Sequence, residues 1–264
     1  MYDNQTNILL LDTPGDFRFD AVWGYLVRSD NECLFRVHDG TLIRCIPVGP
    51  DRPIVTIREA PDGRLGVCIE GVDPSRLPLV REQVRQYVTE WFDLDTDLSP
   101  FYAMAARDPL LKEPAERFRG LRLVGVPDLF EAIGWAILGQ QINLAFAYTL
   151  KRNLVEAFGD SRTGADGVRH LLFPAAETIA NLQPTDLTPL KMTAKKAEYL
   201  IAVAGLIAGG QLTKADLAAA GRAADAERML TGIRGIGPWT AHYVAMRCLR
   251  FRDALPIQDV GLHL

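Results

Sequence analysis

The hydrophobic positions of this chain follow two different periods, and the change falls near residue 100. Between residues 31 and 71, short runs rich in β-branched and aromatic residues alternate with turn signals. Asp39-Gly40 separates one pair of runs and Pro61-Asp62-Gly63 the next, so each predicts a β-hairpin. Apolar residues at helical spacing precede these runs at 19–27 and follow them from Leu77 to Trp91, where Asp73 is a candidate cap. This part is predicted to be an α+β unit of antiparallel sheet plus helices.

Beyond residue 100 the strand signals vanish and helical stripes take over. Residues 128–142 follow Pro127 and form an apolar stripe typical of a buried helix, and the next helical run ends at Gly159. A third helix is predicted to begin after Thr193 as its N-cap. Only short helical pieces are expected in the Pro-, Thr- and Asp-rich segment between the second and third helices. The second half is therefore predicted to be an all-α domain, and it contains no internal repeat.

Length and composition are those of a globular protein with two domains. The chain has 264 residues, of which 48% are hydrophobic and 23% charged, and one domain usually takes ~100–200 residues. The pattern divides it into 1–110 and 111–264. The start lacks a basic region and no apolar run could span a membrane, so neither a secretion signal nor a membrane partner is expected. The four cysteines form no CxxC pair, which favours buried free thiols in a reducing cytosol.

Charge divides along the same boundary. Residues 1–110 carry 11 Lys and Arg against 18 Asp and Glu, a balance of −7, whereas residues 111–264 carry 18 against 15, a balance of +3. The net charge of −4 argues mildly against a nucleic-acid partner for the whole chain. Only the second half could meet phosphates comfortably. Two domains without any binding role could show the same asymmetry, so charge leaves the partner open.

The stretch that carries chemistry is LTGIRGIGPWTAHYVAMRCLRFRDALPIQD, residues 230–259. Helix-like runs flank Gly235-Ile236-Gly237, the pattern of a helix-hairpin-helix. Glycines permit positive φ and leave no Cβ between backbone N–H groups and a phosphate oxygen. Pro238 suits the first turn of the following helix, whose N-terminus favours an anion. The alternative is an αα-hairpin whose glycines only allow close packing, but the downstream PWTA run and carboxylate favour DNA binding.

These residues resemble the helix-hairpin-helix/Gly-Pro-Asp superfamily of DNA repair glycosylases, and most of all its bacterial 3-methyladenine DNA glycosylase II group. Residues 121–150, LRLVGVPDLFEAIGWAILGQQINLAFAYTL, are similar to the first large helices of that group. The resemblance covers nearly the whole chain and implies an α+β TBP-like N-terminal domain before an all-α helix-hairpin-helix glycosylase domain. It also implies a monomeric base excision repair enzyme of the bacterial cytosol or nucleoid. Its partner would be double-stranded DNA with alkylated bases.

The resemblance assigns the chemistry to Asp259, the aspartate beyond the hairpin. Cleaving an N-glycosidic bond builds oxocarbenium character on the sugar, which a fixed carboxylate stabilises while it orients or deprotonates water. Asp259 could also cap a helix beginning at Val260, and the two roles are compatible. Asp253 is interpreted as a loop or capping residue.

Trp239 stands where bifunctional members of the superfamily carry a lysine. Without an amine there no Schiff base can form, so the implied enzyme is monofunctional and leaves an abasic site. Trp239 and Tyr243, four residues apart on one helical face, resemble the aromatic walls of the family's base pocket, and Tyr25 is a third candidate from the first domain. Electron-rich rings suit a cationic purine. Ordinary core aromatics would show the same spacing, so both interpretations stay open.

The resemblance implies that the remaining assigned residues contact DNA or an ion. Gln140 and Gln141 lie where the family inserts a loop into the duplex, with Gln141 in the wedge place; the alternative is a polar helix end facing water. The resemblance implies no cofactor except a structural monovalent cation, held by backbone carbonyls of Thr231, Ile233 and Gly235. The residues expected to contact the DNA backbone are those of the hairpin and the following turn: Arg234, Gly235, Ile236, Gly237 and Thr240.

The chain stops five residues after Asp259, whereas family members continue into further packing helices. This departure predicts either a fragment or a truncated protein. In a truncated protein Asp259 would lie on a fraying end, and the alternative function is a damage-binding module without catalysis. Some relatives carry a four-cysteine iron–sulfur cluster in the region that is missing here. A third interpretation is an all-α scaffold whose hairpin only packs.

Overall fold

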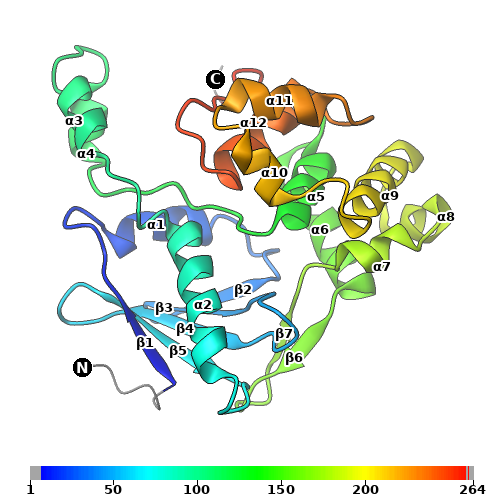
Figure 1. The fold of residues 1–264 in the computed structure, drawn as a ribbon, viewed down its shortest axis with the longest axis horizontal. Helices are drawn as coiled ribbons and strands as arrows, with labels where there is room; N and C mark the ends of the chain where they lie inside the picture. The colour runs from blue at the N-terminus through cyan, green and yellow to red at the C-terminus, as the bar shows by residue number, and fades with distance from the viewer. Residues whose placement is uncertain (1–6, 260, 262–264) are drawn as a thin grey trace. The chain divides into compact units, whose positions relative to one another are not determined.

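The structure, a computed structural model, describes residues 7–259 and 261, which form two compact units (Figure 1). Described residues up to 30 and 35–124 belong to the first unit, and residues 31–34 and those from 125 onward to the second. The division of contacts therefore falls near residue 124, later than the boundary at 110 expected from the sequence. Residues 111–124 pack with the first unit because their side chains and backbone bond to it, as Arg122 does to Asp16.

The first unit contains the antiparallel sheet that the alternating pattern predicts. Its strands are β1 (Ile8–Leu11), β2 (Phe35–His38), β3 (Thr41–Cys45), β4 (Ile54–Glu59) and β5 (Leu65–Glu70). They lie in the order β1-β5-β4-β3-β2, each antiparallel to its neighbours. Both residues of the Asp39-Gly40 turn have positive φ, 46° and 67°, as a two-residue hairpin requires. The sequence pattern does not predict β1, because a short apolar run has no period that separates strand from helix.

Helices complete the first unit: α1 (Phe19–Leu26), α2 (Leu77–Phe92), α3 (Ser99–Ala105) and α4 (Lys112–Arg117). Figure 1 shows α2 lying across the sheet, and Val80, Val84 and Val88 are buried as the helical stripe predicts. Asp73 does not cap α2 itself. Its carboxylate accepts a hydrogen bond from the N–H of Ser75, in the turn that precedes the helix.

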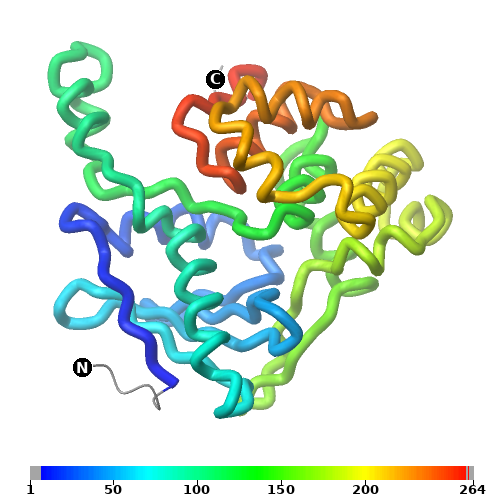
Figure 2. The backbone as a smooth tube through the Cα atoms, viewed as in Figure 1, coloured from blue at the N-terminus to red at the C-terminus, as the bar shows by residue number. Residues whose placement is uncertain are grey.

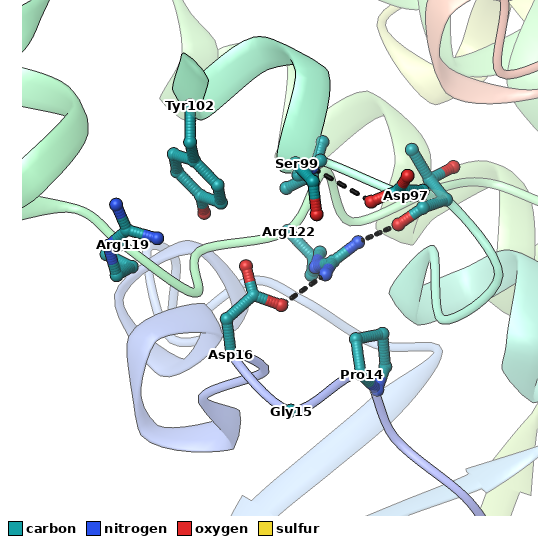
Figure 3. Close-up of a pocket in the computed structure, with 10 residues that line it drawn as sticks. Pro14, Gly15, Asp16, Asp97, Ser99, Tyr102, Arg119 and Arg122 are labelled. Carbon is teal, nitrogen blue, oxygen red and sulfur yellow. Dashed lines mark hydrogen bonds and ion pairs between the residues drawn. The ribbon is translucent and has the colours of Figure 1, made fainter. Parts of the chain in front are cut away.

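A cavity of about 480 Å³ lies within the first unit (Figure 3). Polar side chains that line the cavity contact one another or the nearby backbone. The buried Arg122 donates to Asp16 at 2.7 Å, and the Arg119 guanidinium lies 4.2 Å from the ring centroid of Tyr102. Tyr102 in turn accepts a hydrogen bond from the N–H of Gly120 at 3.0 Å. The cavity contains none of the predicted site residues.

The second unit is mainly helical. Its elements are α5 (Leu129–Gly139), α6 (Leu144–Phe158), β6 (Ser161–Thr163), β7 (Arg169–Leu171), α7 (Ala176–Ala180), α8 (Pro184–Leu187), η1 (Thr188–Leu190), α9 (Ala194–Ala208), α10 (Lys214–Ala219), α11 (Ala223–Thr231) and α12 (Pro238–Arg247). Asp128, at the predicted start of the first of these helices, accepts from the N–H of Glu131 at 2.7 Å, and the predicted cap Thr193 accepts from the N–H of Lys196 at 3.3 Å. The all-α expectation misses only the β6–β7 hairpin, whose three-residue strands are too short to show a period.

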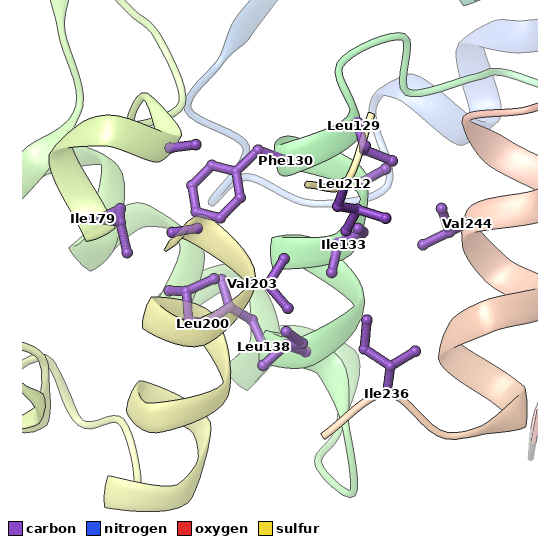
Figure 4. Packing of buried hydrophobic residues seen from close by; sticks show 14 of the residues in the cluster. Leu129, Phe130, Ile133, Leu138, Ile179, Leu200, Val203, Leu212, Ile236 and Val244 are labelled. Carbon is purple, nitrogen blue, oxygen red and sulfur yellow. The ribbon is translucent and has the colours of Figure 1, made fainter. Parts of the chain in front are cut away.

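One apolar core joins the helices of the second unit (Figure 4). Ile133 and Leu138 of α5 belong to it, with Leu200 of α9 on one side of α5 and Val244 of α12 on the other. Ile236, at the tip of the glycine hairpin, reaches into the same cluster and is 4% exposed. Full burial of such a side chain contributes about 1.5–3 kcal/mol, so the hairpin is held to the core by its central residue.

A buried ion pair fixes residues 31–34 in the second unit. Lys151 of α6 donates to both carboxylate oxygens of Glu32, at 2.8 and 2.7 Å, and both side chains are only 8% exposed. Glu32 also accepts from the N–H groups of Cys33 and Leu34. The Lys151 amine lies 5.3 Å from the ring centroid of Trp135. A buried pair needs this number of partners to offset its desolvation.

All four cysteines are free, as expected, but only Cys45 and Cys248 are fully buried. Burial raises the pKa of the Cys33 thiol to about 11, and burial likewise raises the pKa of the Cys68 thiol. These two groups therefore stay protonated and unreactive at neutral pH. Within the described part of the chain, no helix is long and apolar enough to cross a membrane.

Candidate functional site

The two hairpin glycines serve different purposes. Gly235 has φ 96°, and a Cβ at this position would fall 2.2 Å from an atom of the Tyr199 ring. Gly237 has φ −93°, a conformation open to any residue, and a Cβ there would meet nothing within 4 Å. The expectation of positive φ is thus correct for Gly235 and wrong for Gly237. Space in front of Gly237 is left open to a ligand.

The turn from the hairpin into α12 presents unpaired donors. Among the described residues, no acceptor is assigned to the N–H groups of Gly235, Gly237 and Trp239. Pro238 fills the first position of α12, where its missing N–H costs nothing. Free N–H groups at a helix N-terminus attract an anion through their hydrogen bonds and through the helix dipole. The geometry therefore suits a phosphate oxygen.

Gln140 links the end of α5 to the hairpin. Its Nε2 donates to the carbonyl of Gly235 at 2.9 Å and to the Thr240 hydroxyl at 3.1 Å. Thr240 is 2% exposed, so its side chain and the Gln140 amide are used inside the protein. The buried Lys196 donates to the carbonyl of Leu138 at 2.6 Å, and burial lowers the pKa of its amine. These contacts fix the loop that follows α5.

Gln141, the candidate wedge, is the exposed residue of that loop and has φ 57°. A left-handed backbone is uncommon for a residue with a Cβ and costs free energy. Such strain persists only where the surroundings impose it, and it collects at functional sites. The preceding Gln140 is held to the hairpin and to α12 by two hydrogen bonds.

The structure brings Trp239 and Asp259 into direct contact. The indole Nε1–H donates to Asp259 Oδ2 at 2.7 Å, and Asp259 Oδ1 accepts from the N–H of Gly261 at 2.9 Å. The rings of Trp239 and Tyr243 are stacked, with centroids 5.6 Å apart and planes at 27°. The helix expected from Val260 lies outside the described residues, but the bond to Gly261 is of the capping type. A half-buried carboxylate and two aromatic rings thus share one end of α12.

Other assigned residues occupy varied surroundings. The carbonyl of Ile233 accepts from the N–H of Ile236 at 3.1 Å, within the hairpin. Arg234 has a side chain that is 79% exposed and lies 3.5 Å from Glu198. Tyr25 belongs to the first unit, where the Arg28 guanidinium lies 3.8 Å from its ring centroid. Its place in the base pocket stays a prediction.

Comparison with known proteins places this geometry in a family. The model of the family described as HhH-GPD superfamily base excision DNA repair protein matches residues 135–264, and that of the 8-oxoguanine DNA glycosylase N-terminal domain matches residues 30–133. A DNA-3-methyladenine glycosylase of Bacillus subtilis (strain 168) is 48% identical over 259 residues, which are 97% of this chain and 84% of that protein. The chain belongs to the HhH-GPD superfamily.

Two further comparisons concern one more relative in sequence and one solved structure. DNA-3-methyladenine glycosylase 2 of Escherichia coli (strain K12) is 34% identical over 140 residues, 53% of this chain and 48% of that protein. A solved structure of 3-methyladenine DNA-glycosylase from Archaeoglobus fulgidus has a TM-score of 0.77 and 23% identity, covering 97% of this chain and 83% of that one. This likeness shows that the two chains share the fold, with the sheet-containing unit ahead of the helical one.

Asp253 and His242 hold the segment between α12 and Asp259, and the sequence singled out only the first of them. Asp253, interpreted above as a loop or capping residue, accepts from the N–H of Ala223 at 3.2 Å with both oxygens and so caps α11. His242 accepts from the N–H of Leu255 at 3.3 Å. No sequence signal marks this role, because His242 and Leu255 meet only through the fold.

Proposed function

We propose that the chain is a monofunctional DNA glycosylase that excises alkylated purines of the 3-methyladenine type from double-stranded DNA. The observation that carries this proposal is the Asp259 carboxylate, held by the Trp239 indole beside the stacked ring of Tyr243. The relative at 48% identity, the DNA-3-methyladenine glycosylase of Bacillus subtilis, supports the substrate class.

In the proposed reaction Asp259 acts on the sugar of a flipped nucleotide. The bond from C1′ to the purine nitrogen breaks, its electron pair leaves with the base, and the cationic methylated purine departs neutral. Positive charge then develops on the sugar, where the carboxylate stabilises it. Water adds to C1′ and loses a proton to Asp259 or to solvent, leaving an abasic site. Because Oδ1 and Oδ2 each accept one protein hydrogen bond, the carboxylate is held in place during this step.

The aromatic pair supports selection of a charged base. Trp239 and Tyr243 present electron-rich rings, and a cationic purine against such a ring gains roughly 0.5–2 kcal/mol over a neutral one. Undamaged purines lack the charge and are also poorer leaving groups, so binding and chemistry discriminate in the same direction.

The hairpin supports DNA binding without a basic surface. The free N–H groups of Gly235, Gly237 and Trp239 would hold a phosphate, with the exposed Arg234 beside it. Gln141 would fill the gap left by the flipped nucleotide. A single protein molecule suffices for these contacts, so we expect a monomer on the duplex.

A monovalent cation would suit the hairpin carbonyls. Thr231, Ile233 and Gly235 offer hard oxygen donors, and the last two each accept one protein hydrogen bond. A carbonyl oxygen has two lone pairs, so each keeps one for an ion. Such an ion would add positive charge where the phosphate binds.

Base release from a duplex with a single methylated purine tests the proposal. Purified protein should liberate the free base, and the strand should break only after alkali. Borohydride should trap no covalent complex, because the indole of Trp239 cannot form a Schiff base. Tight binding to an abasic-site analogue without base release would favour a damage-binding module instead. A trapped complex would contradict the monofunctional assignment.

Trp239→Phe isolates the hydrogen bond to Asp259 from the aromatic surface. The ring remains, but Asp259 Oδ2 loses its donor. A hydrogen bond to a charged group contributes about 1.5–3 kcal/mol, so the single-turnover excision rate should fall roughly 10- to 100-fold. Affinity for an abasic-site analogue should stay nearly constant.

Trp23→Phe is the matched control, because Trp23 packs on Phe19 of the first unit with ring centroids 4.8 Å apart. It should leave excision unchanged. Wild-type rates in Trp239→Phe would mean that the indole N–H does not serve the reaction.

Gln141→Gly should change stability and activity in opposite directions. Glycine relieves the strain at φ 57°, worth about 1–2 kcal/mol, so thermal or urea unfolding should show a stabilised protein. Loss of the wedge should slow excision at the same time. Gln141→Ala keeps the strained backbone and removes the wedge, so it should lose activity without gaining stability. Full excision by both variants would exclude the wedge role.

A further inference from the structure

The segment that carries Asp259 is irregular, yet three hydrogen bonds that involve side chains fasten it to α11 and α12. After α12 the chain turns back (Figure 2). Asp253 then accepts from the N–H of Ala223, the N–H of Leu255 donates to His242, and Asp259 accepts from Trp239. Two of the three fastenings are made by α12.

The hydrogen bond from Leu255 defines the tautomer of the neutral His242 ring. The N–H of Leu255 can only donate, so Nδ1 of His242 accepts with its lone pair at 3.3 Å. The proton of the neutral ring is therefore on Nε2, which faces Glu227 Oε2 of α11 at 3.1 Å. The carboxylate orients the ring, and the ring in turn holds the backbone. His242 thereby connects α11, α12 and the segment that leads to Asp259.

Hydrogen bonds within the backbone connect Leu255, which His242 holds, to Asp259. The N–H of Ile257 donates to the carbonyl of Leu255 at 2.8 Å, and the N–H of Asp259 donates to the carbonyl of Pro256 at 2.8 Å. Pro256 is buried and has a fixed φ. The four residue steps from Leu255 to Asp259 would span ~13–14 Å in an extended chain. Here they are folded into a turn. A shift of Leu255 would move Asp259 with it.

We propose that His242 is a positioning residue for Asp259, acting through Leu255 and itself oriented by Glu227. The inference rests on the proposed function, in which Asp259 must lie close to C1′. Loss of the Nδ1 acceptor would leave the N–H of Leu255 unpaired and release the turn. Misplacing a catalytic group by about 1 Å can cost a hundredfold in rate.

Three substitutions test the roles of the two ring nitrogens of His242 separately. His242→Leu removes both. His242→Asn keeps an acceptor, since Oδ1 lies as many bonds from Cβ as Nδ1 does, but it cannot reach Glu227. His242→Gln can reach Glu227 but offers nothing at the δ position. His38→Leu, at a histidine whose side chain is 84% exposed in the first unit, is the control.

The first readout is single-turnover excision of a methylated purine beside the affinity for an abasic-site analogue. His242→Leu and His242→Gln should lose roughly 10- to 100-fold in rate, with the dissociation constant within about twofold because the hairpin N–H groups are untouched. His242→Asn should recover most of the rate. Equal losses in the Asn and Leu variants, or none in Leu, would overturn the proposal.

The second readout is hydrogen exchange of residues 249–259, which does not depend on excision. Exchange should accelerate in His242→Leu and return towards the wild-type rate in His242→Asn, while α12 stays protected. If the wild type releases no base but exchange follows this order, the proposed function fails and the anchoring role of His242 stands. Unchanged exchange in His242→Leu would refute the anchoring role whatever the enzyme does.

Discussion

Asp259→Asn is expected to lower the single-turnover rate of base excision by about 10²–10³-fold, the usual cost of removing one group that stabilises transition-state charge. The amide keeps the shape of the carboxylate but carries no charge to set against the oxocarbenium ion. It also offers one acceptor oxygen where the protein has two donors, Trp239 and Gly261. A stability loss of about 1 kcal/mol should accompany the loss of rate.

Asp166→Asn is the matched control for this substitution. Asp166 accepts from the N–H of Val168 at 2.9 Å, the same two-residue spacing as Asp259 and Gly261, but it lies in the β6–β7 hairpin. It removes one carboxylate charge away from the proposed site while its amide oxygen can still accept from Val168, so excision should stay unchanged. Base release measured under single-turnover conditions, with affinity for an abasic-site analogue in parallel, distinguishes the two. An Asp259→Asn enzyme that excises within a few-fold of wild type would show that the charge of Asp259 is not needed.

Gly235→Ala is expected to be the most destabilising single change at the hairpin. The new Cβ would lie 2.2 Å from Cγ of the Tyr199 ring, and the backbone at φ 96° disfavours any side chain. Backbone strain of about 1–2 kcal/mol adds to about 1–3 kcal/mol for overpacking. Denaturant unfolding should therefore show a loss of several kcal/mol, and DNA affinity should fall because the hairpin N–H groups move.

Gly237→Ala is the matched test at the other end of the hairpin. Its Cβ would meet no protein atom within 4 Å and φ is −93°, so stability should stay within about 0.5 kcal/mol of wild type. Its affinity for DNA should nevertheless fall about tenfold, because the methyl group stands between the N–H donors and a phosphate. Wild-type affinity in this variant would support the alternative in which the hairpin only packs. The pair thus separates a glycine required by the protein from one left free for a partner.

Local patterns in the sequence determined most elements of this fold. Alternation and the Asp39-Gly40 signal predicted the sheet because both residues of that turn need positive φ. Asp128 and Thr193 marked helix starts because a side chain there satisfies backbone N–H groups close by in sequence. The run from Gly235 to Asp259 indicated the family. Each of these signals acts within a few residues, or within a motif short enough to recognise.

What the tertiary structure decided concerns residues far apart in the chain. Gln140 bonds to a carbonyl 95 residues away, and Glu32 to an amine 119 residues away. The two glycines of the hairpin look alike in the sequence, yet Tyr199 lies against only one of them. Trp239 carries one indole N–H, and only the return of the chain at Asp259 gives it a partner. A side chain's type states which bonds it can make, but the packing of distant segments decides which of those bonds form. The periods and turns therefore determined the elements, and packing alone determined how the carboxylate of Asp259 is held.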